Sequence, residues 1–188
     1  MSLPAFAARA LLLFALPALA AAAEPFDLAR LMRALAGAPE GKVEFREQKH
    51  SSLLATPVES RGTLSYKRPD VVEKAVVSPR AETYRIEGDK LSVTRGGKTR
   101  SIPLPSQPIL GAFAASLRGV LAGDEKLLRE HFRIALSGTE ADWRLELTPI
   151  DEEVARLVSA VAVTGQATRV AVIEVREAGG DRSVLQVK

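Results

Sequence analysis

The feature that most constrains the fold is a succession of about ten short segments, spread over residues 41–188, in which apolar and polar residues alternate. Alternation with a period of two is typical of β-strands that bury one face. Turn-forming pairs separate these segments, among them Gly88-Asp89, Gly96-Gly97 and Gly179-Gly180. Short strands joined by tight turns predict an antiparallel sheet in which neighbours in sequence pair with one another.

Three segments depart from the strand pattern and predict helices. Apolar residues recur at helical spacing from Phe26 to Leu35, and Gly37 ends that segment. The same spacing occupies residues 107–123, after which Asp124 can cap a short second helix. Residues 149–160 begin with a proline and three acidic residues, as helix N-termini do. The chain is therefore predicted to be α+β, with helices laid across a sheet that supplies most of it.

Some of the predicted strands are apolar on both faces, notably VVEKAVV at 71–77 and RVAVIEV at 169–175. A curved sheet covered by two modest helices cannot bury all of this surface. We therefore expect apolar side chains to line a concavity.

The first residues predict export from the cytoplasm. Residues 1–23 combine Arg9, an apolar stretch and small residues with Ala-x-Ala choices before Glu24, as secretory signal peptides do. A retained membrane anchor is the alternative, but the apolar run contains Pro17 and is shorter than the ~20 residues that a spanning helix needs. We expect cleavage between Ala21 and Glu24, leaving residues 24–188 as one domain.

The chain has no cysteine, so we expect neither a lipid anchor at the cleavage point nor a disulfide. The 26 basic and 23 acidic residues are interspersed, and no basic run has aromatic residues beside it, which argues against nucleic acid as a partner.

The sequence lacks the groups that most enzymes need. It has no G-x-S-x-G motif and no thiol, and its two histidines, His50 and His131, stand far apart with no metal-ligand spacing. His50 beside Ser51 can be drawn as a base and a nucleophile, but a solvated turn explains the pair better. We therefore expect no catalysis, no metal and no cofactor.

The order of elements resembles the LolA family of periplasmic outer-membrane lipoprotein carriers, from about Phe26 to Lys188. The resemblance rests most on GTLSYKRPD at 62–70, with looser support from FREQK at 45–49 and YRIEGDKL at 84–91. It implies an incomplete antiparallel β-barrel, which is a strongly curved sheet, with an N-terminal helix and a helical lid over an apolar concave face.

The resemblance also implies a function. Such a carrier is a periplasmic monomer that takes the acyl chains of a lipoprotein from an inner-membrane transporter and passes them to an outer-membrane acceptor. Core packing is the alternative role for each candidate residue, and we expect Leu64→Asp or Leu117→Asp to abolish acyl binding without unfolding the domain. The expected cavity lining is Phe45, Leu64, Tyr66, Val72, Val77, Ile86, Val93, Leu145 and Leu147, and the expected lid residues are Leu110, Phe113, Leu117 and Leu121.

Arg68 has a special place in the resemblance, which implies that its guanidinium hydrogen-bonds carbonyls of the lid and so holds the cavity shut. Pro69 fixes its own φ and biases Arg68 away from helical geometry, so the strand must end or bend there. A planar guanidinium with five donors suits carbonyls that would otherwise be buried unpaired. A solvated cation at a strand end is the alternative.

Two further alternatives concern the cargo and the role. The chain has only nine aromatic residues, and small residues such as Val72 favour a wide cavity, so a fatty-acyl, polyene or glycolipid cargo fits as well as a lipoprotein. A protein of the same fold can also act as a non-enzymatic periplasmic sensor or scaffold that binds lipid or lipoprotein as a signal. Sensors of that kind are expected to carry a second domain, and this sequence ends at Lys188 directly after its last predicted strand.

Overall fold

The computed structural model describes residues 26–188, so the predicted signal peptide lies outside the described residues. Eleven strands form one antiparallel sheet in the order β6-β5-β4-β3-β2-β1-β11-β10-β9-β8-β7. Because β6 and β7 form the two edges, the sheet does not close, and the predicted incomplete barrel is confirmed. The strands are β1 (Gly41–His50), β2 (Val58–Lys67), β3 (Val71–Ser78), β4 (Glu82–Glu87), β5 (Lys90–Arg95), β6 (Lys98–Pro103), β7 (Phe132–Thr139), β8 (Asp142–Pro149), β9 (Val158–Gln166), β10 (Arg169–Glu177) and β11 (Arg182–Val187).

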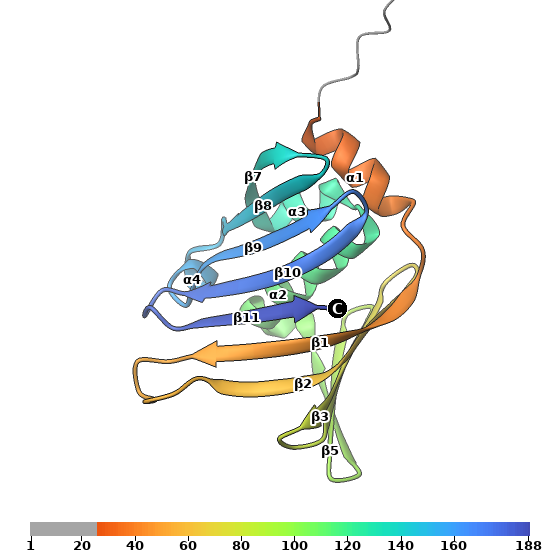
Figure 1. The fold of residues 1–188 in the computed structure, drawn as a ribbon. Helices are drawn as coiled ribbons and strands as arrows, with labels where there is room; N and C mark the ends of the chain where they lie inside the picture. The colour runs from red at the N-terminus through yellow and green to blue at the C-terminus, as the bar shows by residue number, and fades with distance from the viewer. Residues whose placement is uncertain (1–25) are drawn as a thin grey trace, which may run out of the picture.

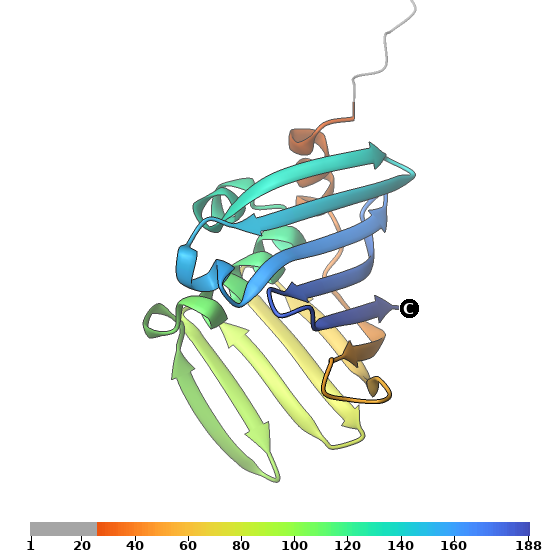
Figure 2. The ribbon, with the colours of Figure 1, turned by 90° about the vertical axis from the view of Figure 1, so that its left-hand side faces the viewer.

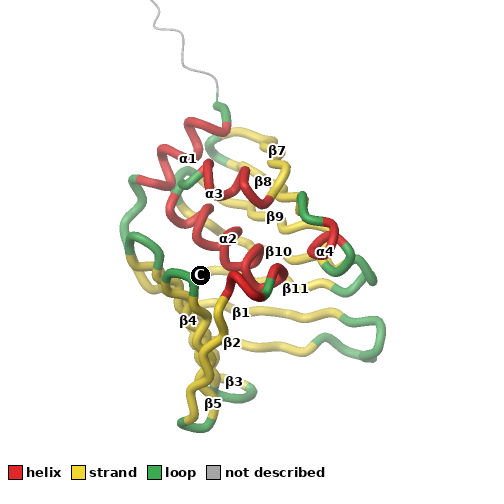
Figure 3. The backbone as a smooth tube through the Cα atoms, turned by 180° about the vertical axis from the view of Figure 1, so that it is seen from behind, coloured by secondary structure: helices red, strands yellow, loops and turns green. Residues whose placement is uncertain are grey.

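The sheet curves strongly, and the helices lie on its concave side. Figure 1 shows β8 to β11, β1 and β2 face-on, whereas β3 to β5 are seen nearly edge-on. Turning the molecule brings the β3 to β6 half into view as a second wall (Figure 2). Seen from behind, the helices cross in front of the sheet (Figure 3). They are α1 (Leu28–Ala36), α2 (Pro108–Ala122), α3 (Glu125–His131) and α4 (Glu152–Ala155), with a 3-10 turn at Leu104–Ser106 before α2.

Local sequence signals explain where the first two helices begin and end. Asp27 caps α1 by accepting a hydrogen bond from the Arg30 N–H at 2.8 Å, and Gly37 follows its last turn. Gly123 ends α2 in the left-handed conformation, with φ +65°. A Cβ at this position would lie 2.1 Å from the Met32 carbonyl oxygen, so only glycine lets the end of α2 pack this closely on α1.

The half of the sheet from β7 to β10 forms a packed core with α2 and α3. Cross-strand pairing places Leu145 opposite Val163 and Val163 opposite Ile173, so that they form one inward row. Trp143 is fully buried, lies against Gly165 and donates its indole N–H to the Ala167 carbonyl at 3.0 Å. Strands β7 to β9 therefore stabilise the fold without lining a large cavity, whereas β10 reaches the cavities described below.

Two predictions about elements were wrong. The helix expected over 149–160 ends at Ala155, because the apolar residues from Val158 onward join β9 between β8 and β10. The strand β6 was not predicted, because among Lys98 to Pro103 only Ile102 is a large apolar residue and there is no alternation to detect. Tertiary pairing decides both segments.

Within residues 26–188 no helix has the length and apolar character needed to cross a bilayer.

Candidate functional site

A cavity of about 390 Å³ lies between α2 and the inner face of β3, β4 and β5. It belongs to the size range of small-molecule pockets. Five predicted residues line it: Val72, Ile86, Leu110, Phe113 and Leu117. The sequence prediction missed further apolar members, namely Val76, Pro79, Leu91 and Leu104.

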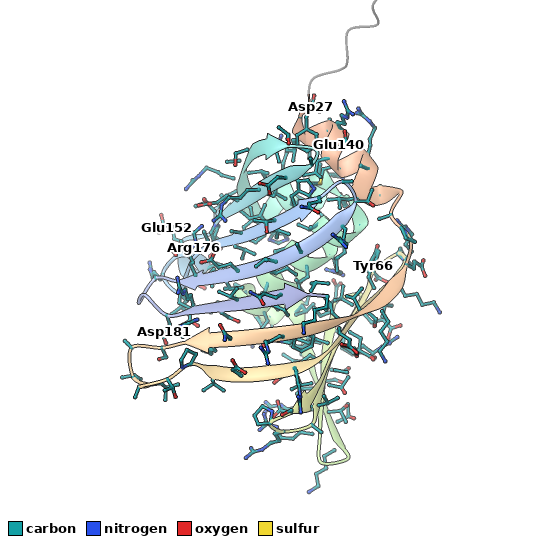
Figure 4. The ribbon with its side chains drawn as sticks, in the orientation of Figure 1. Asp27, Tyr66, Glu140, Glu152, Arg176 and Asp181 are labelled. Carbon is teal, nitrogen blue, oxygen red and sulfur yellow. The ribbon has the colours of Figure 1, made fainter. Side chains whose placement is uncertain are left out.

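A second cavity of about 470 Å³ lies where α1 leads into β1, beside the ends of β2, β10 and β11. The predicted residues Leu64, Tyr66 and Leu121 line it. Figure 4 shows Tyr66 on this side of the molecule. Apolar members that the prediction missed are Leu35, Ala38, Pro39, Val43, Val170, Ala171 and Val187.

The two cavities and a small space between them are together called the hollow here; it is bordered by α2 and, at the second cavity, also by the end of α1. A space of about 30 Å³ lies between them and is lined by Leu64, Phe113 and Leu117, each of which also lines one of the larger cavities. These three side chains therefore form a constriction in the hollow.

Five of the predicted lining residues lie elsewhere. Phe45, Leu145 and Leu147 are buried in the core and line neither large cavity. Val93 lies opposite Tyr84, on the inner face of the sheet, but also outside both linings. Val77 is 64% exposed, and its prediction as a lining residue was wrong.

The position of Val77 follows from strand parity and a bulge. Val72 and Val76 point into the cavity, so the odd-numbered position points away. The register between β2 and β3 also shifts at this point, since Arg61 pairs with Ser78 and Gly62 with Val76, which leaves Val77 as the extra residue.

Two charged residues of the apolar lining, Lys74 and Glu47, form an ion pair with each other. The Lys74 Nζ lies 2.6 Å from a Glu47 carboxylate oxygen and 5.1 Å from the centre of the Phe45 ring. Glu47 also accepts hydrogen bonds from the Ser60 and Ser183 hydroxyls at 3.0 and 2.7 Å. Burial raises the pKa of Glu47, but the Lys74 charge and these hydrogen bonds outweigh it, so that the pKa lies below its ordinary value. Glu47 is therefore held as a carboxylate.

This lowered pKa predicts a pH-dependent stability. The Glu47 pair stabilises the fold above the ordinary glutamate pKa of about 4.3, and the contribution disappears as the pH falls through the lower pKa of the folded state. At pH 7 we expect Glu47→Gln to lower the free energy of unfolding by about 1–3 kcal/mol, because Lys74 loses its partner. The difference in the free energy of unfolding between Glu47→Gln and the unmodified protein should shrink as the pH falls toward 3. Urea denaturation at several pH values measures this difference. Glu44→Gln, an exposed change on the same strand, is the control; a difference that does not vary with pH would contradict the prediction.

Arg68 makes a different contact from the one expected. Its guanidinium donates to the carbonyl of Ala36, the last residue of α1, and not to α2. The Arg68 backbone N–H donates to Glu40 at 3.0 Å, and the guanidinium carbon lies 5.8 Å from the centre of the Tyr66 ring. Arg68 thus fixes the end of α1 beside the second cavity. Through the close contact at Gly123, α1 in turn supports the end of α2.

The residue that ties α2 itself to the sheet is Arg118, which the sequence prediction missed. Its guanidinium donates to the Gly88 carbonyl at 2.9 Å, in the turn between β4 and β5. Asp70 holds the same turn by accepting the Gly88 N–H at 2.9 Å. From sequence alone, an arginine in the middle of an amphipathic helix that hydrogen-bonds the sheet looks the same as one that is a solvated surface charge.

An open, strongly curved antiparallel sheet with a helix-covered apolar hollow defines the class of protein. Residues 20–186 match the family model described as outer membrane lipoprotein carrier protein, LolA-like, which spans most of the chain. The chain belongs to this LolA-like family.

Solved structures give weaker likenesses, and no curated protein matches. A LolA superfamily protein from Nitrosomonas europaea is 16% identical, with 84% of this chain and 90% of that chain covered and a TM-score of 0.47. A putative outer membrane lipoprotein-sorting protein domain from Vibrio parahaemolyticus is 11% identical, with 86% and 88% covered and a TM-score of 0.47. The Mycobacterium tuberculosis lipoprotein LppX is 13% identical, with 86% and 93% covered and a TM-score of 0.42.

Proposed function

We propose that this protein is a periplasmic carrier that holds the acyl chains of a lipoprotein, or of another lipid, in the hollow beneath α2 and moves them from the inner to the outer membrane. The observation that carries the proposal is the two-part apolar hollow, of about 390 and 470 Å³, bordered by α2 and, at the second cavity, also by the end of α1. Membership of the LolA-like family supports a lipoprotein cargo.

The physical basis is the removal of hydrocarbon from water, which needs no cofactor. Each methylene that enters an apolar cavity contributes about 0.8 kcal/mol. A chain of about sixteen carbons, mostly buried, contributes on the order of 10 kcal/mol before the entropic costs of binding, which offset much of it. The remainder is compatible with a complex that survives transit and still releases its cargo.

The proposal has several parts. The signal peptide at residues 1–23 is removed on export, the mature chain acts as a monomer, an inner-membrane transporter supplies the cargo, and an outer-membrane acceptor receives it.

Gentle purification followed by native mass spectrometry tests the proposal. We expect the mature chain to carry an acyl lipid, or to bind a long-chain fluorescent fatty acid at micromolar concentration. Absence of both results would refute the carrier function.

Arg68 gives a second test, which concerns release. Its contact with the Ala36 carbonyl stabilises the closed, empty form, and an open, loaded form competes with that contact. We therefore expect Arg68→Leu to fold normally but to transfer its acyl cargo to acceptor vesicles several-fold more slowly, measured as a transfer rate. Lys67→Leu, which removes the adjacent exposed cation, is the control. Equal transfer rates in the two variants would exclude the latch role and leave the carrier function in place.

A further inference from the structure

The cavity beneath β3 to β5 is amphipathic along its length. At one end the apolar pair Val72 and Ile86 lies under Leu104. On the same inner face of the sheet, the following cross-strand pairs are Lys74 with Tyr84 and then Val76 with Glu82. Beyond them, Pro79 and Arg80 complete the lining at the turn between β3 and β4. At about 3.3 Å per strand residue, the polar end lies more than ~10 Å from the apolar end.

The charges at the polar end are not equally available. Glu47 is engaged by Lys74 at 2.6 Å. Glu82 accepts hydrogen bonds from the Tyr84 hydroxyl at 2.5 Å and forms an ion pair with Arg95 at 2.7 Å. Both carboxylates are thus already neutralised by protein partners.

Arg80 is the exception among these groups. It is exposed, and within residues 26–188 it makes no hydrogen bond or ion pair; its charge acts on Glu82 only through space. A guanidinium that no carboxylate occupies, at the open end of an apolar cavity, is suited to bind a carboxylate or a phosphate with two parallel hydrogen bonds.

We propose that the cavity selects an anionic amphiphile, with its hydrocarbon tail between α2 and the Val72–Ile86 end and its carboxylate or phosphate headgroup at Arg80. This inference rests on the proposed acyl-binding function and adds to it the charge and the orientation of the cargo. Lys74 lies between the two ends, so a longer headgroup can also reach its ammonium group.

Three twelve-carbon probes that differ in headgroup test the inference: dodecanoate, dodecanol and dodecyltrimethylammonium. Each is used below its micellar concentration to displace a neutral fluorescent reporter from the mature protein. We expect dodecanoate to bind about tenfold more tightly than dodecanol, the effect of one charge-assisted contact, and the cation to bind most weakly. Arg80→Gln should reduce the affinity for dodecanoate to that for dodecanol and leave dodecanol unchanged.

Arg133→Gln is the matched control. It removes the same charge from an exposed position on β7, at the opposite edge of the sheet, and should leave all three affinities unchanged. A phosphate probe, monododecyl phosphate, distinguishes the two anion classes by its affinity relative to dodecanoate. Equal binding of dodecanoate and dodecanol by the unmodified protein would overturn the headgroup site but not acyl binding. A loss in Arg80→Gln that is the same for both probes would also overturn the site. Failure of every probe to displace the reporter would instead count against the proposed function.

Discussion

The substitution Phe113→Asp is expected to lower the affinity for a long acyl chain about 100-fold or more while the protein stays folded. Phe113, on α2, lines the cavity of about 390 Å³ and also forms part of the constriction between the two cavities. A carboxylate there has to be desolvated when hydrocarbon fills the space. The side chain is 40% exposed, so without an acyl chain the same carboxylate stays hydrated.

Binding of a fluorescent fatty acid and urea denaturation, measured on the same variant, check both halves of this prediction. Ile109→Asp is the matched control, because Ile109 lies on the same helix, is 37% exposed and lines neither large cavity. Unchanged acyl affinity in Phe113→Asp would show that the cargo does not occupy the space under α2.

The structure makes Phe113 a better choice than the two leucines that the sequence favoured. Leu64 is 5% exposed and Leu117 is 9% exposed, and both belong to the hydrophobic core cluster. An aspartate at either position would destabilise the folded state, so loss of binding there would not separate the site from the fold.

The second large effect is expected on stability. Trp143→Ala should lower the free energy of unfolding by about 3–5 kcal/mol, because it removes a fully buried indole and leaves a void against Gly165. It also leaves the Ala167 carbonyl without the indole donor. Chemical denaturation at pH 7 measures the change, and Trp143→Phe, which keeps an aromatic ring but not the N–H, should lose less.

The Trp143→Ala variant also tests whether the packed core and the binding cavities are separate parts of the molecule. Trp143 lines none of the cavities described above, so the folded fraction of Trp143→Ala should bind a fatty acid with unchanged affinity. A large loss of affinity at a temperature where the variant is folded would show that the core formed by β7 to β9 contributes to binding.

Local pattern was sufficient for most of the secondary structure. Alternation predicted ten of the eleven strands, and Gly37 and Asp124 predicted where α1 ends and where α3 begins. It failed for β6, whose polar residues are held by pairing with β5 alone. It failed again after Ala155. There, acidic residues that favour a helix N-terminus are followed closely by β9, which pairs with its neighbours in the sheet.

For the site, alternation identified the inward face but not what lies above it. Leu145 and Val72 both belong to strands and both point inward, yet Leu145 is packed in the core and Val72 borders a hollow. What packs above each strand depends on the curvature of the whole sheet. The same holds for the contacts of Glu47 with Lys74 and of Arg68 with Ala36, which join residues 27 and 32 positions apart.

The sequence by itself determined ten of the strands, the ends of the first helices, the absence of disulfides and the apolar face, because each follows from residues close together in the chain. Only the tertiary structure decided where that face is filled and where it is hollow, which charges are paired, and that Arg80 has no partner among residues 26–188. Those properties depend on the curvature of an eleven-stranded sheet against one helix, and no short stretch of residues encodes that curvature.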